Sequence, residues 1–280
     1  MSSKESADFT IANAFNGIEV VNANYTKQNF SKHVHEGYTI GVIEYGAQRF
    51  FRSGASHVAG QSSIILVNAD DVHTGQSAAE HGWGYKAMYP TPEHFSQISA
   101  DLHYGKNLAP YFQSSVINDP YLADQLRLIF AQLEANGSQL LMETLFYSTL
   151  MSLTLRHASA LDLPKEINGS KSKLLLAKEF LDSYPEQDVA LAKLAEISDL
   201  SQFHFVRQFK KYFHLAPHAY QVQMRLKKAK ALLKIGMKPS DVSGDCGFYD
   251  QSHFTHHFKK ALGTTPSRFQ KQARIYNTLD

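Results

Sequence analysis

Two groups of histidines have the residue types and the spacing of metal or ligand sites. His33 and His35 form an HxH pair, and His73 follows later in the chain. Near the C-terminus, His253 and His257 lie four residues apart, a spacing that can hold zinc on one face of a helix. No carboxylate or second cysteine completes a tetrahedral set in that C-terminal segment. We therefore expect those two histidines to contact phosphate or to pack on a helix surface, with no metal bound.

Basic residues are concentrated in the C-terminal part of the chain. From Lys171 onward there are 18 Lys+Arg against 10 Asp+Glu, and the rest of the chain has 10 against 16, which gives the small net charge of +2. This asymmetry predicts a C-terminal surface that attracts an anion. Nucleic acid is the leading candidate, because clustered cations release counterions from a phosphate backbone. The alternative is that the basic residues form a solvated face.

Composition indicates a folded globular protein. The 280 residues are 43% hydrophobic and 19% charged, which argues against bulk disorder and allows two domains. The single Cys246 cannot form an internal disulfide. The N-terminus lacks the basic start and apolar run of a signal peptide, and no apolar run reaches the roughly 18 residues of a membrane helix. We expect a cytoplasmic protein without a membrane segment.

The hydrophobic periodicity predicts an α+β protein. Residues 37–89 alternate strand-like runs with glycine breaks, whereas later segments have helical spacing, including a helix after Pro217 with Arg225 among the cations on its polar sides. We expect residues 1–117 to form a β-barrel with a flexible N-terminal arm. Residues 118–159 are expected to form a helix pair that both completes the barrel core and serves as a dimer interface. Residues 160–171 are expected to be a linker and residues 172–280 an all-α domain.

The C-terminal domain contains an internal duplication. SQFHFVRQFKKYFHLAPHAY (201–220) aligns without gaps with DQSHFTHHFKKALGTTPSRF (250–269). Each copy follows a short helical segment and a turn, in which Asp199 and Gly247 occupy the positions that favour a left-handed backbone. A short helix, a turn and a second helix with one polar face are typical of a helix-turn-helix. The sequence therefore predicts two such units.

The second helix of each unit is expected to read DNA. The paired phenylalanines four residues apart should be buried, which turns the opposite face outward. Arg207 is expected to bind a guanine through two hydrogen bonds, while the lysines contact phosphate. The residues expected to contact DNA are Gln202, Phe203, Val206, Arg207, Lys210, Lys211, Gln251, Ser252, His253, His256 and Lys260.

Three C-terminal segments resemble the DNA-binding domain of the AraC/XylS family of bacterial transcription regulators. They are LAKLAEISDLSQFHFVRQFKK, PHAYQVQMRLKKAKALL and GFYDQSHFTHHFKKALGTTPSRF. The resemblance implies two helix-turn-helix units on one connecting helix, which enter adjacent major grooves of promoter DNA. His256 stands where the family usually has Arg, and Pro239 and Gly244 weaken the first helix of the second unit. We therefore expect the first unit to dominate specificity.

The N-terminal part resembles the cupin-type sensing domain of the same family, through HVHEGYTIGVIEYG (33–46) and VNADDVHTGQ (67–76). In one interpretation the barrel binds a small-molecule effector. The expected effector-binding residues are His33, His35, Tyr38, His73, Trp83 and Tyr85. In a second interpretation a metal-dependent cupin enzyme carries an appended helical interaction domain. Its metal ligands would be His33, His35, Glu44 and His73. In a third, the histidines are hydrogen-bonded within the barrel wall.

The sensor interpretation fits best beside a DNA-binding domain. We expect a ligand-responsive transcription regulator that acts as a homodimer, binds double-stranded promoter DNA and a small-molecule effector, and contacts RNA polymerase if it is an activator. No enzyme activity, cofactor or metal is expected.

Overall fold

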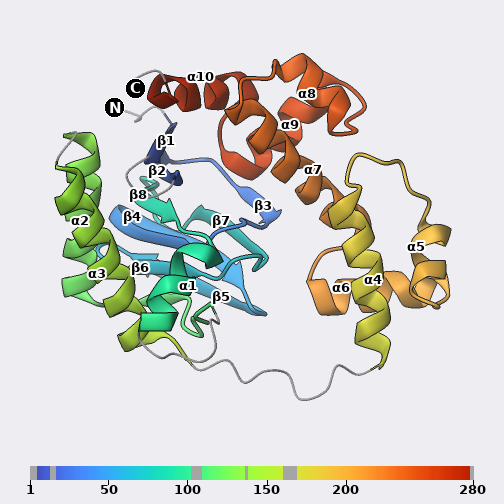
Figure 1. The fold of residues 1–280 in the computed structure, drawn as a ribbon, viewed down its shortest axis with the longest axis horizontal. Helices are drawn as coiled ribbons and strands as arrows, with labels where there is room; N and C mark the ends of the chain where they lie inside the picture. The colour runs from blue at the N-terminus through green and yellow to red at the C-terminus, as the bar shows by residue number, and fades with distance from the viewer. Residues whose placement is uncertain (1–4, 13–16, 102–108, 136–137, 160–168, 278–280) are drawn as a thin grey trace. The chain divides into compact units, whose positions relative to one another are not determined.

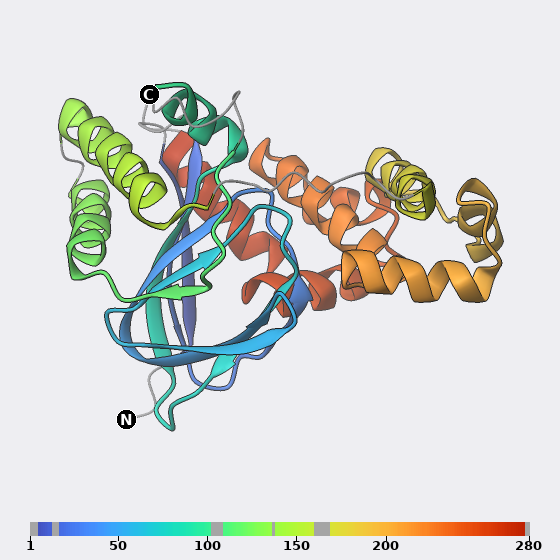
Figure 2. The same cartoon turned by 90° about the horizontal axis from the view of Figure 1, so that it is seen from below.

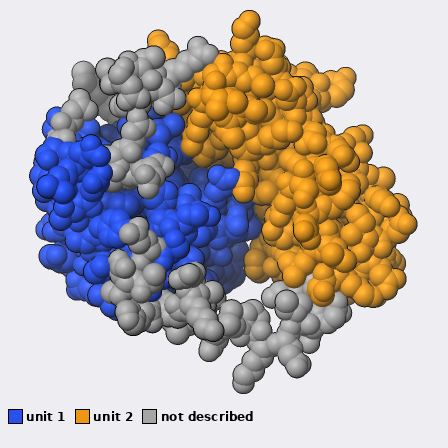
Figure 3. Space-filling model, in the orientation of Figure 1, with its two compact units in different colours: residues 1–161, 275–280 blue, residues 162–274 orange. Residues whose placement is uncertain are grey.

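The computed structural model describes residues 5–12, 17–101, 109–135, 138–159 and 169–277 (Figure 1). The chain divides into two compact units, residues 1–161 with 275–280 and residues 162–274 (Figure 3). The first unit combines an antiparallel sheet with helices, and the second is helical, which confirms the predicted α+β class. Within the described ranges, no helix combines the length and the apolarity that crossing a bilayer requires.

The sheet of the first unit is antiparallel throughout its described pairings. Its strands are β1 Ser6–Ala12, β2 Ile18–Tyr25, β3 Phe30–His33, β4 Thr39–Arg52, β5 Ala55–Gly60, β6 Ile64–Val67, β7 His73–Ser77, β8 Trp83–Tyr89 and β9 Val116–Ile117. The main path runs β1-β2-β8-β4-β6-β9, while β5 and β7 pair with β4, and β3 pairs with β7. Figure 2 shows how strongly this sheet curls.

The long strand β4 belongs to both halves of the sheet. Its first half pairs with β6 and β8, and its second half pairs with β5 and β7. The register shifts between Ile43 and Tyr45, and Gly46 follows with φ of 69°. A Cβ at Gly46 would lie 2.0 Å from the carbonyl oxygen of Gly82, so only glycine allows this close approach. The bend folds the two halves of the sheet toward each other around an interior.

Side chains alternate between this interior and a helix-covered face. Ile18, Val20, Val42 and Met88 share a buried core with α2 Pro120–Glu134 and α3 Gln139–His157, and α1 Pro92–Asp101 adds to it. Figure 1 shows α2 and α3 side by side on that face. One apolar stripe of α2 lies in this core. Its members are Leu122, Leu126, Ile129 and the partly buried Leu133. The helix pair therefore completes the core of the first unit.

The expected N-terminal arm is in part a strand of the sheet. β1 pairs along its whole length with β2, from Ser6 opposite Asn24 to Ala12 opposite Ile18. Just before it, the Glu5 carboxylate accepts hydrogen bonds from the backbone N–H groups of Thr26 at 3.0 Å and Gln28 at 2.8 Å. The prediction of a flexible arm is therefore wrong for residues 6–12. Residues 1–4 and 13–16 lie outside the described residues.

The second unit is built from helices. They are α4 Gly169–Ser183, α5 Leu191–Ile197, α6 Gln202–Phe213, α7 Pro217–Lys234, α8 Pro239–Asp245, α9 Gln251–Leu262 and α10 Pro266–Asn277. Helix α4 begins inside the segment predicted as a linker, of which residues 160–168 lie outside the described residues. Helix α7 lies centrally and contacts α4, α6, α8 and α9. It therefore connects the two copies of the duplication.

Candidate DNA-binding and ligand-binding sites

The first helix-turn-helix consists of α5, a turn and α6. Asp199 in the turn has φ of 48°, the left-handed conformation that its position predicted. Ser201 caps α6, because its hydroxyl accepts a hydrogen bond from the backbone N–H of His204 at 3.4 Å. Phe205 and Phe209 are both fully buried beneath α6. This anchoring turns the opposite face of α6 to solvent.

The outer face of α6 carries the predicted DNA-contacting residues. Phe203 near its start is 75% exposed, and Arg207 is exposed one turn later. The exposed Gln202, Lys210 and Lys211 and the half-buried Val206 complete the predicted set. The apolar ring and the guanidinium near the N-terminal end can contact base edges. The two lysines in the last turn can contact phosphates.

The second helix-turn-helix consists of α8, a turn at Gly247 and α9. Gly247 has φ of 74°, and Asp250 caps α9 by accepting a hydrogen bond from the backbone N–H of His253 at 2.7 Å. Phe254 and Phe258 are fully buried, like their counterparts in α6. The predicted contacts Gln251, Ser252, His256 and Lys260 are exposed. Both copies therefore fold in the same way.

His253 differs from the prediction. It is half-buried, its ring packs against Phe248, and its Nε2 lies 3.0 Å from Nε2 of His257. Burial, together with the positive charges of His253 and other neighbours, lowers the pKa of His257 to about 4. The pair therefore packs on the flank of α9. Of the predicted DNA contacts beyond the first turn of this helix, His256 and Lys260 have exposed side chains.

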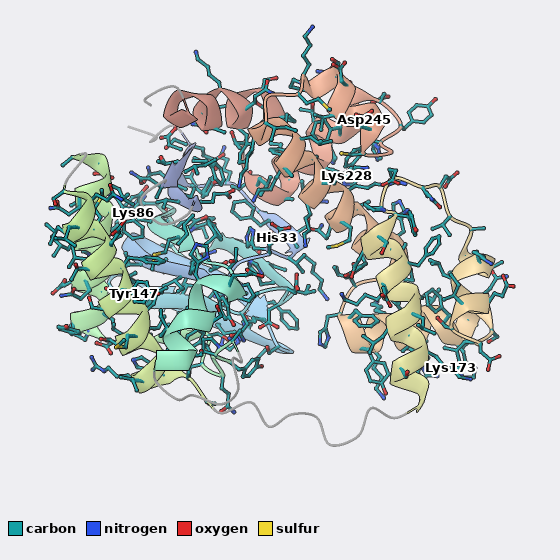
Figure 4. All side chains as sticks on the ribbon, in the orientation of Figure 1. His33, Lys86, Tyr147, Lys173, Lys228 and Asp245 are labelled. Atoms are coloured by element: carbon teal, nitrogen blue, oxygen red, sulfur yellow. The ribbon has the colours of Figure 1, made fainter. Side chains whose placement is uncertain are left out.

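Helix α7 holds the loop that precedes α5. The guanidinium of Arg225 donates hydrogen bonds to the carbonyl oxygens of Pro185 at 2.8 Å and Gln187 at 3.2 Å, and Gln221 donates to the same two oxygens. Lys228 of α7 forms an ion pair with Glu186 at 3.0 Å (Figure 4). Arg225 is therefore buried and structural, whereas its sequence position placed it on a polar side of the helix.

Three histidines meet inside the curled sheet of the first unit. His33 lies on β3 (Figure 4), His73 lies opposite it on β7, and His35 follows β3. One possible ligand nitrogen from each lies within 4.8 Å of the others. His33 and His73 are buried, and burial lowers the pKa of His73 to about 4. The structure thus brings together the histidines that the HxH motif and its later partner predicted.

A wall of aromatic rings lies on the same interior. Tyr25 contacts Trp83 and Tyr85, with ring centroids 5.3 and 6.4 Å apart, and the Tyr89 ring lies 4.8 Å from that of His35. Burial raises the pKa of Tyr85 to about 12. Trp83 is fully buried, and its Nε1–H has no hydrogen-bond partner among the described residues. Such a donor is a ready contact for a ligand or water.

Sequence reasoning found Trp83 and Tyr85 but missed Tyr25 and Tyr89. Strand alternation contained the information, because positions two residues apart share a face and Tyr85 is followed by Tyr89 on the same strand. Tyr25 additionally required the register, which pairs it with Trp83 across β2 and β8.

Two other predicted barrel residues lie elsewhere. The hydroxyl of Tyr38 donates to the carbonyl oxygen of Pro110 at 2.7 Å, and its ring packs on Phe95 and Phe112 in the helix-covered core. The prediction that Tyr38 contacts the effector is therefore wrong, because its side chain packs in the helix-covered core. Glu44, the carboxylate of the enzyme interpretation, accepts a hydrogen bond from Arg127 at 3.2 Å and is absent from the histidine cluster.

Comparison with known proteins agrees with this organisation. The model of the AraC-like ligand binding domain matches residues 15–150, and that of a helix-turn-helix domain matches residues 194–272. The chain is 27% identical over 226 residues to YbfI, an uncharacterized HTH-type transcriptional regulator of Bacillus subtilis (strain 168), covering 81% of this chain and 82% of that protein. It is 26% identical over 233 residues to the HTH-type transcriptional activator RhaS of Klebsiella pneumoniae (strain 342), covering 80% and 81%.

A solved structure shares the fold. ToxT of Vibrio cholerae O395 superposes with a TM-score of 0.57 at 14% identity and covers 91% of this chain and 98% of its own. The fold and the two sites define a DNA-binding transcription regulator with a separate ligand-binding domain. The chain belongs to the AraC family of transcriptional regulators.

Proposed function

We propose that this regulator inserts α6 and α9 into adjacent major grooves on one face of promoter DNA. The observation that supports this proposal is that both helices are capped, anchored and exposed in the same way. Each is capped at its start, anchored by two buried phenylalanines and exposed on a face that ends in two lysines. Helix α7 contacts both helices, and a stiff connection of this kind suits two insertions about one turn of DNA apart.

The first unit is proposed to carry more of the base specificity. Arg207 on α6 has an exposed guanidinium, which can form a bidentate hydrogen bond with guanine. On α9 the matching position is His256, and the neighbouring His253 is partly withdrawn into a packed pair. Because α9 has no guanidinium at this position, it is proposed to have a larger share of phosphate contacts.

Substitution of Arg207 tests this assignment. Arg207→Ala should cost about 1–3 kcal/mol of operator binding and relax the preference at one base pair. Lys211→Ala should instead weaken binding to all sequences similarly and reduce the salt slope by about one. Lys193→Ala removes an exposed lysine from α5 and serves as the matched control. Competition binding with single-base operator variants measures both effects, and unchanged selectivity of Arg207→Ala would refute the assignment.

The interior of the curled sheet is proposed to bind the effector. Support comes from the three clustered histidines, the tyrosine rings and the Trp83 N–H, which has no partner among the described residues. Strand alternation places Tyr25, Trp83, Tyr85 and Tyr89 on the face opposite the helix-covered core residues Val20 and Met88. Effector binding must favour one arrangement of the protein over another, since otherwise it cannot change DNA occupancy. The regulator is proposed to act in the cytoplasm and, as the name of RhaS suggests, as an activator. If it is an activator, it is expected to contact RNA polymerase.

The outer face of α3 is proposed to form a homodimer interface. Leu140 is 74% exposed and Leu155 is 63% exposed, and Thr144 and Ser148 lie between them on the same stripe. The opposite stripe of α3 is buried in the core of the first unit, so this helix has apolar residues on two sides. Exposed leucines aligned on a helix are typical of a partner surface.

A further inference from the structure

The histidine cluster of the first unit has the size of a metal site. His33, His35 and His73 each place a ring nitrogen within 4.8 Å of the other two. The His33 and His73 ring centroids are 4.2 Å apart, and His35 lies 5.0 and 5.1 Å from them. Ligand nitrogens at about 2.0–2.1 Å from a tetrahedral metal ion are about 3.3 Å apart, so small ring rotations would close the cluster around an ion.

Backbone hydrogen bonds set the tautomers of two of these rings. Nδ1 of His33 lies 2.7 Å from the carbonyl oxygen of Ser31, and Nδ1 of His73 lies 3.0 Å from that of Asp71. A carbonyl oxygen only accepts, so each Nδ1 must carry the proton and donate it. Each Nε2 then presents a lone pair. Metal-binding histidines are usually oriented by such a bond from the other ring nitrogen to a carbonyl or carboxylate.

Among the described residues, the positive charge that acts on His73 comes from an arginine that is already paired. The buried Arg52 near His73 is paired with Asp71 at 2.8 Å, and its other donors reach Ser115 and the carbonyl oxygen of Phe112. Glu44 is engaged by Arg127, so the donor set consists of three imidazoles. Imidazole nitrogens suit zinc, copper, iron and nickel, whereas calcium and magnesium prefer oxygen ligands.

We propose that His33, His35 and His73 bind one divalent first-row transition-metal ion through ring nitrogens, with at least one coordination position left open. This goes beyond the proposed function, which requires an effector but no particular ligand chemistry. The aromatic wall formed by Tyr25, Trp83, Tyr85 and Tyr89 adjoins the cluster, because the Tyr89 ring lies 4.8 Å from that of His35. An effector with a carboxylate or other donor atom would complete the coordination there.

Metal titration of the whole chain tests the proposal. The chain is first stripped with a chelator, and calorimetry with zinc chloride is expected to give one tight site per chain. Titration with cobalt chloride should give the visible absorption of a cobalt ion bound to nitrogen ligands. Neither readout involves DNA or an effector, so the result is independent of the proposed function. Absence of a one-to-one site for both metals would overturn the proposal.

Variants locate the site. His35→Ala and His33→Gln should each weaken metal binding by at least about tenfold. Removing a residue that only hydrogen-bonds to a metal ligand already has an effect of this size. His81→Ala, at an exposed position of the same unit, is the matched control and should leave the affinity unchanged. The double variant His253→Ala/His257→Ala tests the other close histidine pair and should also bind as the parent does. Loss of the site in this double variant, or its retention in both His33→Gln and His35→Ala with unchanged circular dichroism, would refute the assignment.

Discussion

The same side-chain type serves different purposes at different places in this chain. His33 and His73 are buried with their tautomers set by backbone carbonyls, and His256 lies exposed on α9. His253 and His257 instead form a packed pair. Residue type and spacing identified both groups of histidines, but only their burial and hydrogen-bond partners distinguish the proposed ligand site from a packed pair.

His257 should make the second helix-turn-helix sensitive to acid. Its pKa is lowered from 6.5 to about 4 by burial and by the charges of His253, His256, Lys260 and, from α7, His218. The unfolded chain therefore binds more protons than the folded chain between these pH values. The stability contribution is complete above about pH 6.5 and is lost as the pH falls toward 4.

Urea unfolding followed by circular dichroism at pH 7 and pH 5 measures this effect. The parent chain should lose more stability than His257→Gln between the two pH values, by about 1 kcal/mol after allowance for solvent screening at this half-buried group. His204→Gln, at an exposed position of α6, should follow the parent. Equal losses in the parent and in His257→Gln would contradict the assignment.

At the scale of elements, the turn at Gly247 needs a glycine for two reasons, its left-handed backbone and a close approach to another segment. The sequence predicted a left-handed turn residue, and φ of 74° agrees. The structure adds a close approach, because a Cβ there would lie 2.2 Å from the carbonyl oxygen of Glu186. Glu186 belongs to the loop before α5 and also pairs with Lys228. The turn of the second helix-turn-helix therefore packs directly on the loop that leads into the first.

Gly247→Ala should destabilise the second unit by at least about 2 kcal/mol, through left-handed strain and the clash with the Glu186 carbonyl. Gly244→Ala is the matched control, because Gly244 lies exposed in α8 and a Cβ there meets nothing within 4 Å. That change should be neutral or stabilising by up to about 1 kcal/mol. Urea unfolding followed by helical circular dichroism compares them, and similar midpoints for both variants would disprove the packing argument.

At the scale of the whole molecule, the two units separate recognition of DNA from recognition of a ligand. The excess of Lys and Arg lies in the helical unit, while the histidine cluster and the aromatic wall lie in the β unit. Helices α2 and α3 complete the core of the β unit and leave exposed leucines on α3. Dimerisation through that face would bring two DNA-binding units to one promoter.

Charges on α3 should disrupt the proposed dimer. Leu140→Glu/Leu155→Glu is expected to shift the chain from dimer to monomer in analytical ultracentrifugation, because each apolar contact would be replaced by a like-charged pair across a twofold axis. Leu176→Glu, at an exposed leucine of α4, is the control and should remain dimeric. A parent chain that sediments as a monomer at micromolar concentration would exclude this interface.

Much of this organisation was predictable from local pattern. The duplicated segments predicted both helix-turn-helix units, because the phenylalanines four residues apart and the left-handed turn positions are local properties. The HxH motif and His73 likewise predicted one cluster. Tyr38 and Glu44 were misplaced because each lies near the motif in sequence but faces Pro110 or Arg127, partners that only chain folding brings close.

The sequence by itself therefore determined the β unit and the helical unit, the two helix-turn-helix units with their buried phenylalanines, and the three clustered histidines. The tertiary structure decided which polar groups are buried and which partners they meet. It placed Arg225 against the Pro185 carbonyl, paired His253 with His257, and brought Tyr89 beside His35 and Tyr25 beside Trp83. The physical reason is that helix and strand periods fix only the face on which a side chain lies, whereas burial and hydrogen bonding depend on segments distant in the chain.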